Sequence, residues 1–136
     1  MSVIQIAIRI LLADVGVTSL VSANIYPLAA PQEAVRPYVA TSLVFEDQDT
    51  VLQGHRDGFN SRVSFACVAA SLQAADGIAE AIKAAMSKVV NVVVMDGDGE
   101  PLATATAFKE GTDFSDFTDD RTVFRRVLDY NLRWAR

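Results

Sequence analysis

The sequence predicts one α+β domain, with helices on one face of a mainly antiparallel sheet of four to five strands. The length of 136 residues suits a single hydrophobic core, so we expect one domain over residues 1–136. Apolar residues recur at helical spacing in two segments, and they alternate with polar residues in most of the others. These patterns follow one another in the order α-β-β-α-β-β, with two main helices.

The first expected helix spans residues 2–13. Apolar side chains occupy most of its circumference, and only Gln5 and Arg9 mark a polar stripe. Such a helix is expected to be covered on most sides. Gly16 ends the pattern, and a short turn up to Ala23 follows. The apolar start resembles a secretory signal, but it lacks basic residues at its beginning and Arg9 interrupts it, so we expect no export.

Two antiparallel strands are expected next, over residues 38–45 and 60–69, joined by a polar loop. Cys67 lies in the alternating apolar row of the second strand. It is the only cysteine, which excludes an internal disulfide, and its position predicts a small buried side chain. A chain with one unpaired cysteine suits a reducing cytosol.

The second half begins with Ser71, a residue suited to cap a helix that we expect to run to Val90. Residues 92–108 then predict a strand, a turn and another strand. After an acidic loop, residues 122–134 form the clearest strand, in which only Arg126 interrupts the apolar face. That face carries Phe124, Leu128, Tyr130, Leu132 and Trp134.

No group of residues has the spacing of a catalytic or metal site. His55 is the only histidine, and no nearby serine or cysteine offers a nucleophile for it to activate. The segment Asp96–Glu100 resembles the start of a calcium loop, but the glutamate required at the twelfth position is Ala107. Its Asp-Gly pairs favour a hairpin turn instead. We therefore expect no enzyme activity, no cofactor and no metal.

Glycine-rich nucleotide motifs are also incomplete. Gly97 and Gly99 lack the third glycine of a dinucleotide fingerprint, whose place is taken by Leu102, and no Walker-type Gly-Lys-Ser/Thr occurs. Apolar runs fall short of the roughly twenty residues that cross a membrane, so no membrane partner is expected. A small enzyme or ligand-binding domain with an unrecognised site remains an alternative.

Charge is distributed unevenly along the chain. The formal net charge is −5, which argues against a surface that grips nucleic acid, because phosphate contacts need clustered lysine and arginine. Residues 96–120 have a formal charge of −7, and residues 121–136 have +4. The acids between residues 110 and 120 are typical of a solvated surface.

The segment NIYPLAAPQEAVRPYV, residues 24–39, holds three of the four prolines and two of the three tyrosines. Each proline fixes φ and restricts the residue before it, so a stiff, extended connector is expected. Tyr26 and Tyr38 have rings that can be buried while their hydroxyls stay hydrogen-bonded, and we expect them to anchor the two ends of the connector.

This connector and the surrounding order of elements resemble the phage tail-to-head joining, or tail terminator, family, long catalogued as a domain of unknown function. In the connector the resemblance is carried by Tyr26, Pro27, Pro31, Pro37 and Tyr38. Around it are the apolar first helix, VATSLVF, RVSFACVAA, SLQAADGIAEAIKAAM and the closing RVLDYNLRW. The resemblance covers nearly the whole chain and departs from the family pattern at residues 91–101.

The resemblance implies a structural virion protein without enzyme activity. Copies are expected to form a ring, a hexamer in the family, which caps the tail tube and joins it to the head while DNA passes through. The implied partners are other copies, the major tail tube protein and a head-completion or connector protein. The implied location is the virion neck, after assembly in the bacterial cytoplasm. An acidic chain suits such a passage, because negative charge does not hold phosphates. Another neck or head-completion component is the nearest alternative.

A ring larger than a dimer needs two different surfaces on each subunit. Arg125 and Arg133 alternate with the apolar face of the last strand and should point away from the core. We expect them to meet Asp113, Asp116 or Asp119 of the neighbouring subunit. The alternative is that this loop and strand neutralise each other within one subunit.

Overall fold

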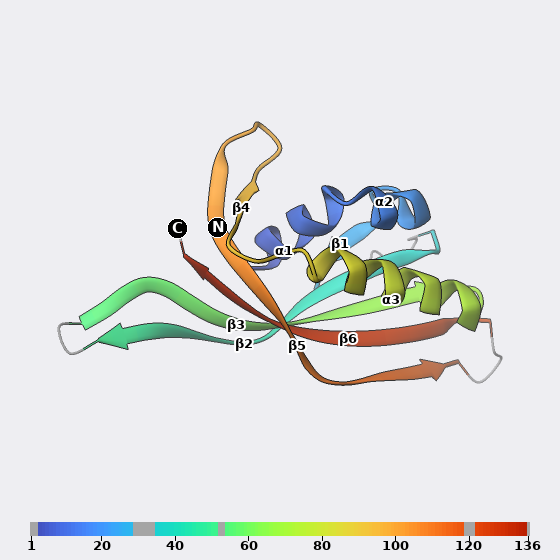
Figure 1. Ribbon diagram of the computed structural model, residues 1–136. Coiled ribbons are helices and arrows are strands. Elements are labelled where there is room, and N and C mark those ends of the chain that lie inside the picture. Colours follow the sequence, from blue (N-terminus) through green and yellow to red (C-terminus); the bar gives the residue numbers. More distant parts are fainter. Residues whose placement is uncertain (1–2, 29–34, 52–53, 119–121, 136) are drawn as a thin grey trace.

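The structure is a computed structural model that describes residues 3–28, 35–51, 54–118 and 122–135, without the side chains of residues 48–51, 54–57 and 112. Within these residues, three helices lie on one face of a six-stranded sheet (Figure 1). The elements are α1 (Val3–Leu12), α2 (Val15–Val21), β1 (Ile25–Pro27), β2 (Tyr38–Val51), β3 (Gly54–Ala69), α3 (Leu72–Met86), β4 (Val92–Met95), β5 (Pro101–Phe117) and β6 (Phe124–Ala135).

The sheet has the strand order β1-β2-β3-β6-β5-β4, in which β1 and β2 are parallel and all other neighbours are antiparallel. The predicted α+β class and the placement of helices on one face are confirmed. The strand number is corrected to six, and the element order gains α2, β1 and a third strand after α3. β1 has only three residues, too few to show alternation, and contains Pro27, which strands accept at a sheet edge.

A long hairpin replaces the polar loop expected between residues 45 and 60. β2 continues to Val51, and β3 begins at Gly54, paired by the register Val51↔Gly54. Figure 1 shows this hairpin projecting beyond the helix-covered body. We call residues 43–51 and 54–57 the arm. A strand with polar residues on both faces shows no alternation of apolar and polar residues. The sequence pattern therefore predicted a loop for the arm.

β5 corrects a second loop prediction. It extends to Phe117, through the segment expected to be an acidic loop, and pairs with β6 on both sides of an irregularity between Glu110 and Phe114. There, residues 111–113 lie opposite Leu128 alone, as the flanking pairs Glu110↔Asp129 and Phe114↔Val127 show. The extra residues form a bulge that redirects the strand.

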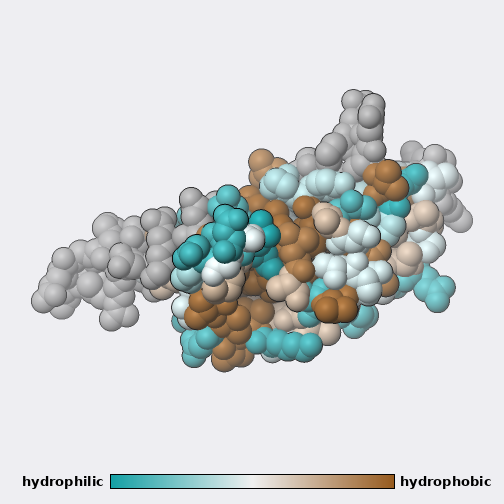
Figure 2. All heavy atoms as spheres, turned by 90° about the horizontal axis from the view of Figure 1, so that it is seen from above, coloured by the Kyte–Doolittle hydropathy of each residue, from teal (hydrophilic) through white to brown (hydrophobic). Residues whose placement is uncertain are grey.

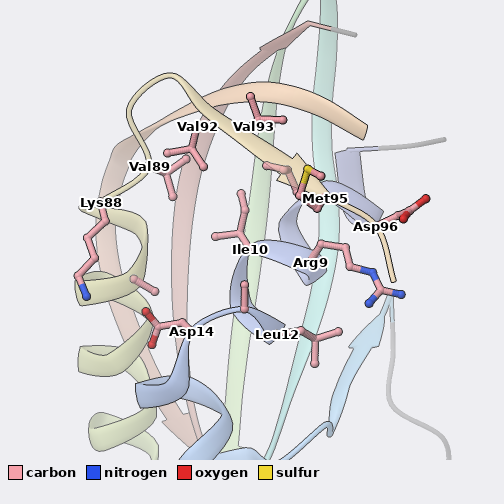
Figure 3. Close-up of a pocket in the computed structure, with 13 residues that line it drawn as sticks. Arg9, Ile10, Leu12, Asp14, Lys88, Val89, Val92, Val93, Met95 and Asp96 are labelled. Atoms are coloured by element: carbon pink, nitrogen blue, oxygen red, sulfur yellow. The ribbon is translucent and has the colours of Figure 1, made fainter. Parts of the chain in front are cut away.

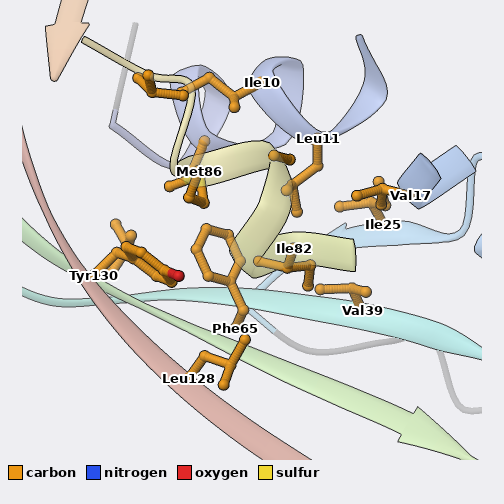
Figure 4. Packing of buried hydrophobic residues seen from close by; sticks show 14 of the residues in the cluster. Ile10, Leu11, Val17, Ile25, Val39, Phe65, Ile82, Met86, Leu128 and Tyr130 are labelled. Carbon is orange, nitrogen blue, oxygen red and sulfur yellow. The ribbon is translucent and has the colours of Figure 1, made fainter. Parts of the chain in front are cut away.

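The core lies between the helices and the sheet. α3 buries Ile82 and Met86 toward Phe65 and Leu128 of the sheet (Figure 4), and its Ile78 is also buried. Ser71 caps α3 as expected, since its Oγ accepts a hydrogen bond from the Ala74 backbone N–H at 3.1 Å. The helix ends at Met86, before the expected Val90. α1 is covered on most sides, as expected. Its buried residues are Val3, Ile6, Ala7, Ile10 and Leu11.

The predicted buried face of β6 is confirmed. Trp134 is 4% exposed, and Tyr130 and Leu128 are also buried. The Trp134 indole N–H donates to Ser61 Oγ at 3.0 Å, and its ring stacks on Phe59 with centroids 4.4 Å apart. Cys67 is fully buried, as predicted, and burial raises the pKa of its thiol to about 12.

Candidate interaction surfaces

The two ends of the proline-rich connector lie side by side. Tyr26 on β1 and Tyr38 on β2 make an edge-to-face contact with ring centroids 5.9 Å apart. The Tyr26 hydroxyl donates to Asn24 Oδ1 at 3.4 Å. Pro27 ends β1, and Pro37 directly precedes β2. The two tyrosines are half-buried and contact each other where the connector begins and ends.

Pro31 and Asp119 were also candidate residues, and both lie outside the described residues. The side chain of His55 is not described either. Its backbone lies in β3, opposite Thr50 of β2.

Asp113 lies at the centre of a charge cluster inside the subunit. Its side chain is only 14% exposed, and it forms ion pairs with Lys83 at 2.7 Å, Lys109 at 2.7 Å and Arg126 at 3.0 Å. These cations come from α3, β5 and β6. The sequence left open whether Asp113 pairs with a neighbouring subunit or within its own, and the structure shows its carboxylate engaged within one chain.

The same cluster explains why Arg126 interrupts the apolar face of β6. Its guanidinium also donates to Asp76 Oδ1 of α3 at 2.8 Å, so the helix and the sheet are joined through one side chain. Burial disfavours the charged form of Asp113, but hydrogen bonds from Lys109, Lys83 and Arg126 outweigh it and hold its pKa well below the usual range. The cluster is charged at neutral pH, and we assign it a structural role.

The expected ring-interface arginines are exposed, on the face of β6 opposite its apolar row. Arg125 forms a two-pronged ion pair with Asp116 of β5 in the same chain, with Nε donating to Oδ1 at 2.9 Å. This is the intramolecular alternative that the sequence left open. Arg133 lies over the Phe108 ring at 5.7 Å and has no ion pair among the described residues.

A groove of about 550 Å³ opens where α1, the end of α3 and β4 meet. Figure 3 shows Ile10 directed from α1 toward Val92 and Val93, with Lys88 and Arg9 on either side. β4 is the last strand of the sheet, and Val92, Val93 and Met95 are exposed on it. The space-filling view from above shows hydrophobic surface exposed between hydrophilic groups on this helix-bearing side (Figure 2).

The four charged residues of the groove differ in how they are engaged. Asp14 Oδ1 accepts the Val17 N–H at 3.1 Å, and Asp96 Oδ1 accepts the N–H groups of residues 98 and 100 at 2.8 and 2.9 Å. The hydrogen bonds accepted by Asp96 confirm the predicted hairpin turn. Arg9 and Lys88 are exposed and have no ion pair among the described residues. The groove therefore has apolar walls with two basic and two acidic side chains around them.

Among the described residues, no three His, Cys, Asp or Glu side chains are grouped to hold a metal ion. No single helix among these residues is long and apolar enough to cross a membrane, although α1 and α2, bent by 89°, reach the required length and composition together.

No protein-family model and no curated protein matches this chain. Among solved structures, the fold is similar to a chain described as the virion of a native gene transfer agent (GTA) particle. The TM-score is 0.63, the sequence identity is 19%, and the match covers 96% of this chain and 92% of that chain. This similarity shows that the two chains share a fold along nearly their whole length.

Proposed function

We propose that this chain is a structural virion protein of the tail terminator type: copies form a ring, a hexamer by the family resemblance, that caps the tail tube and joins it to the head. The observation that carries the proposal is the fold similarity over 96% of the chain to a protein from a gene transfer agent virion. The sequence resemblance to tail-to-head joining proteins supports it independently.

Features of the molecule support an assembly role over an enzymatic one. An extended arm projects from the body, and the groove exposes apolar side chains on β4. Surfaces of this kind mark sites of protein contact. The proposed partners are further copies, the major tail tube protein and the head-completion or connector protein, with DNA passing through the ring without sequence-specific binding.

Deletion of the gene from the strain that produces the particles tests the proposal. A missing terminator should leave DNA-filled heads unattached to tails, with tails of irregular length, and a plasmid copy should restore joining. Negative-stain electron microscopy of the lysate reports both features. Joined, transfer-competent particles from the deletion strain would contradict the proposal. Unjoined heads beside tails of uniform length would assign the chain to another neck component.

A further inference from the structure

A pocket of about 340 Å³ lies where the end of β6 pairs with β5, and Arg133 is the only charged residue among the described residues that line it. Arg133 alternates with the buried Leu132 and Trp134, so its side chain lies on the sheet face that the helices leave uncovered. The described side chains of this Arg133 pocket therefore have a formal charge of +1.

The guanidinium of Arg133 is positioned without the use of its N–H donors. Its Cζ lies 5.7 Å from the centroid of the Phe108 ring, and it forms no ion pair or hydrogen bond among the described residues. Thr104 also lines the pocket and is exposed. A planar guanidinium with free donors binds a carboxylate through two parallel hydrogen bonds. The pocket is thus suited to a carboxylate.

The turn between β4 and β5, residues 96–100, carries such carboxylates. Asp98 and Glu100 are exposed, and neither side chain has an ion pair or hydrogen bond within the part of the chain that the structure describes. Asp96 instead accepts the backbone N–H groups of both residues. The segment has a formal charge of −3, and Arg9, whose guanidinium lies beside this turn, offsets at most one of these charges. The turn therefore keeps a net negative charge.

Other described acids fit the pocket less well. Ion pairs within the subunit already engage most of them, as in Asp113, Asp116 and Asp129.

Asp47 and Glu110 are not engaged in this way, but they lie on the same sheet face as Arg133. The register runs Asp47↔Asn60↔Arg133, and Glu110 shares its side of β5 with Thr106, the partner of Arg133. Contact through either acid would bring the same face of two copies together, which is the arrangement of a two-fold dimer rather than of a larger ring.

We propose that the turn of one copy places Glu100, with Asp98 beside it, in the Arg133 pocket of the next copy. Figure 1 shows the connection between β4 and β5 projecting from the body. Eight positions separate Glu100 from Phe108, the ring below the guanidinium, which is about 26 Å along an extended strand. Turn and pocket are thus two different surfaces, as a ring requires. This inference rests on the proposed ring and names one contact that closes it.

Exchange of the two charges tests this contact. Arg133→Glu and Glu100→Arg each place like charges at the contact, and we expect each alone to raise the concentration needed for half-assembly about fivefold at low salt. The chain with both substitutions keeps the net charge of −5 and should recover most of this loss. Sedimentation velocity over a concentration and salt series measures all three variants.

A matched control has the same net charge but an unchanged turn. Arg133→Glu with Asp47→Arg should stay as impaired as Arg133→Glu alone. Arg133→Glu with Asp119→Arg examines an acid outside the described residues and should also stay impaired. Glu100 takes part in the turn only through its backbone, so its substitution leaves the hydrogen bonds of Asp96 in place. Thermal unfolding at an unchanged midpoint confirms that each variant is folded.

Recovery in the exchanged chain, without recovery in the two controls, supports the contact between turn and pocket. Single variants that assemble as readily as the wild type, an exchanged chain that does not recover, or a control that recovers equally well overturns it, while wild-type rings leave the proposed function standing. A wild-type chain that stays monomeric at every concentration contradicts the contact and the proposed ring together.

Discussion

Arg126 donates from Nη2 to Asp113 Oδ2 at 3.0 Å, which ties the last strand to the bulge in β5. The bulge contains Gly111, whose φ of +62° is accessible to glycine at little cost. Asp113 at the end of this bulge also reaches Lys83 of α3. The bulge therefore positions one carboxylate to join two strands and a helix.

We expect Asp113→Asn to lower the free energy of unfolding by about 2 kcal/mol at pH 7, because three cations lose their shared counter-charge in a partly buried site. Urea denaturation followed by circular dichroism measures the change. The matched control is Glu80→Gln. Glu80 is exposed and 3.6 Å from Lys83, so its substitution should change stability by less than about 0.5 kcal/mol. Equal effects would show that the cluster does not stabilise the fold.

Stability should fall in acid because of the same carboxylate. The folded state holds the pKa of Asp113 below its ordinary value of 3.8, so the unfolded chain binds a proton more readily. The stabilisation is fully present above about pH 4 and is lost as the pH falls further. The Asp113→Asn variant should lose less stability than the wild type between pH 4 and pH 2. Parallel curves for the two proteins would contradict this assignment.

Gly111→Ala should destabilise the protein by about 1 kcal/mol, because a positive φ is unfavourable for a residue with a Cβ. The added carbon would also lie 3.2 Å from Arg62 Nη2. Gly77→Ala is the matched control with the opposite sign. It lies in α3, its Cβ would meet nothing within 4 Å, and alanine favours the helix by about 1 kcal/mol. Thermal unfolding should show a lower melting temperature for Gly111→Ala and a higher one for Gly77→Ala.

Trp134→Ala should lower stability by about 3–5 kcal/mol, since it removes a buried indole that stacks on Phe59. Trp134→Phe keeps much of the packing but removes the N–H that donates to Ser61. We expect Trp134→Phe to lose less stability than Trp134→Ala, and the difference reflects the packing that phenylalanine retains. An alanine variant with wild-type stability would show that this face of β6 is not buried.

Arg133→Glu should weaken ring assembly at low salt and recover partly as salt screens the new repulsion, because Arg133 is exposed without an ion pair among the described residues. Arg125→Glu with Asp116→Arg reverses an intramolecular pair and should assemble more readily than Arg125→Glu alone. Light scattering over a salt series reports both results. Assembly of Arg133→Glu at the wild-type concentration would remove Arg133 from the interface.

Sequence patterns predicted those elements that have one buried face and one solvent-exposed face. β6 is the clearest example, because Leu128, Tyr130 and Trp134 are buried while Arg125 and Arg133 are exposed. α3 and its cap at Ser71 were predictable for the same reason. The arm was not, because its strands leave the core and no longer need alternating polarity.

The ion pairs and the groove depend on contacts distant in sequence. The cluster of acids around Asp113 predicted a solvated carboxylate, whereas the pairing of β5 with β6 and the packing of α3 bring it to Arg126 and Lys83. The groove joins Ile10 of α1 to Val92 of β4, which are far apart in the sequence. A sequence signal for it did exist: three consecutive valines follow α3, whereas a strand with one exposed face alternates apolar and polar residues.

The exposed edge of β2 also affects the tendency of unassembled subunits to aggregate. A long unpaired strand is a template for aggregation, and inward or outward charges on such an edge are a common protection. Glu46 and Asp47 place like charges on the arm of every monomer, so two arms that meet edge to edge repel each other. This repulsion opposes the edge-to-edge stacking of free copies into fibrils.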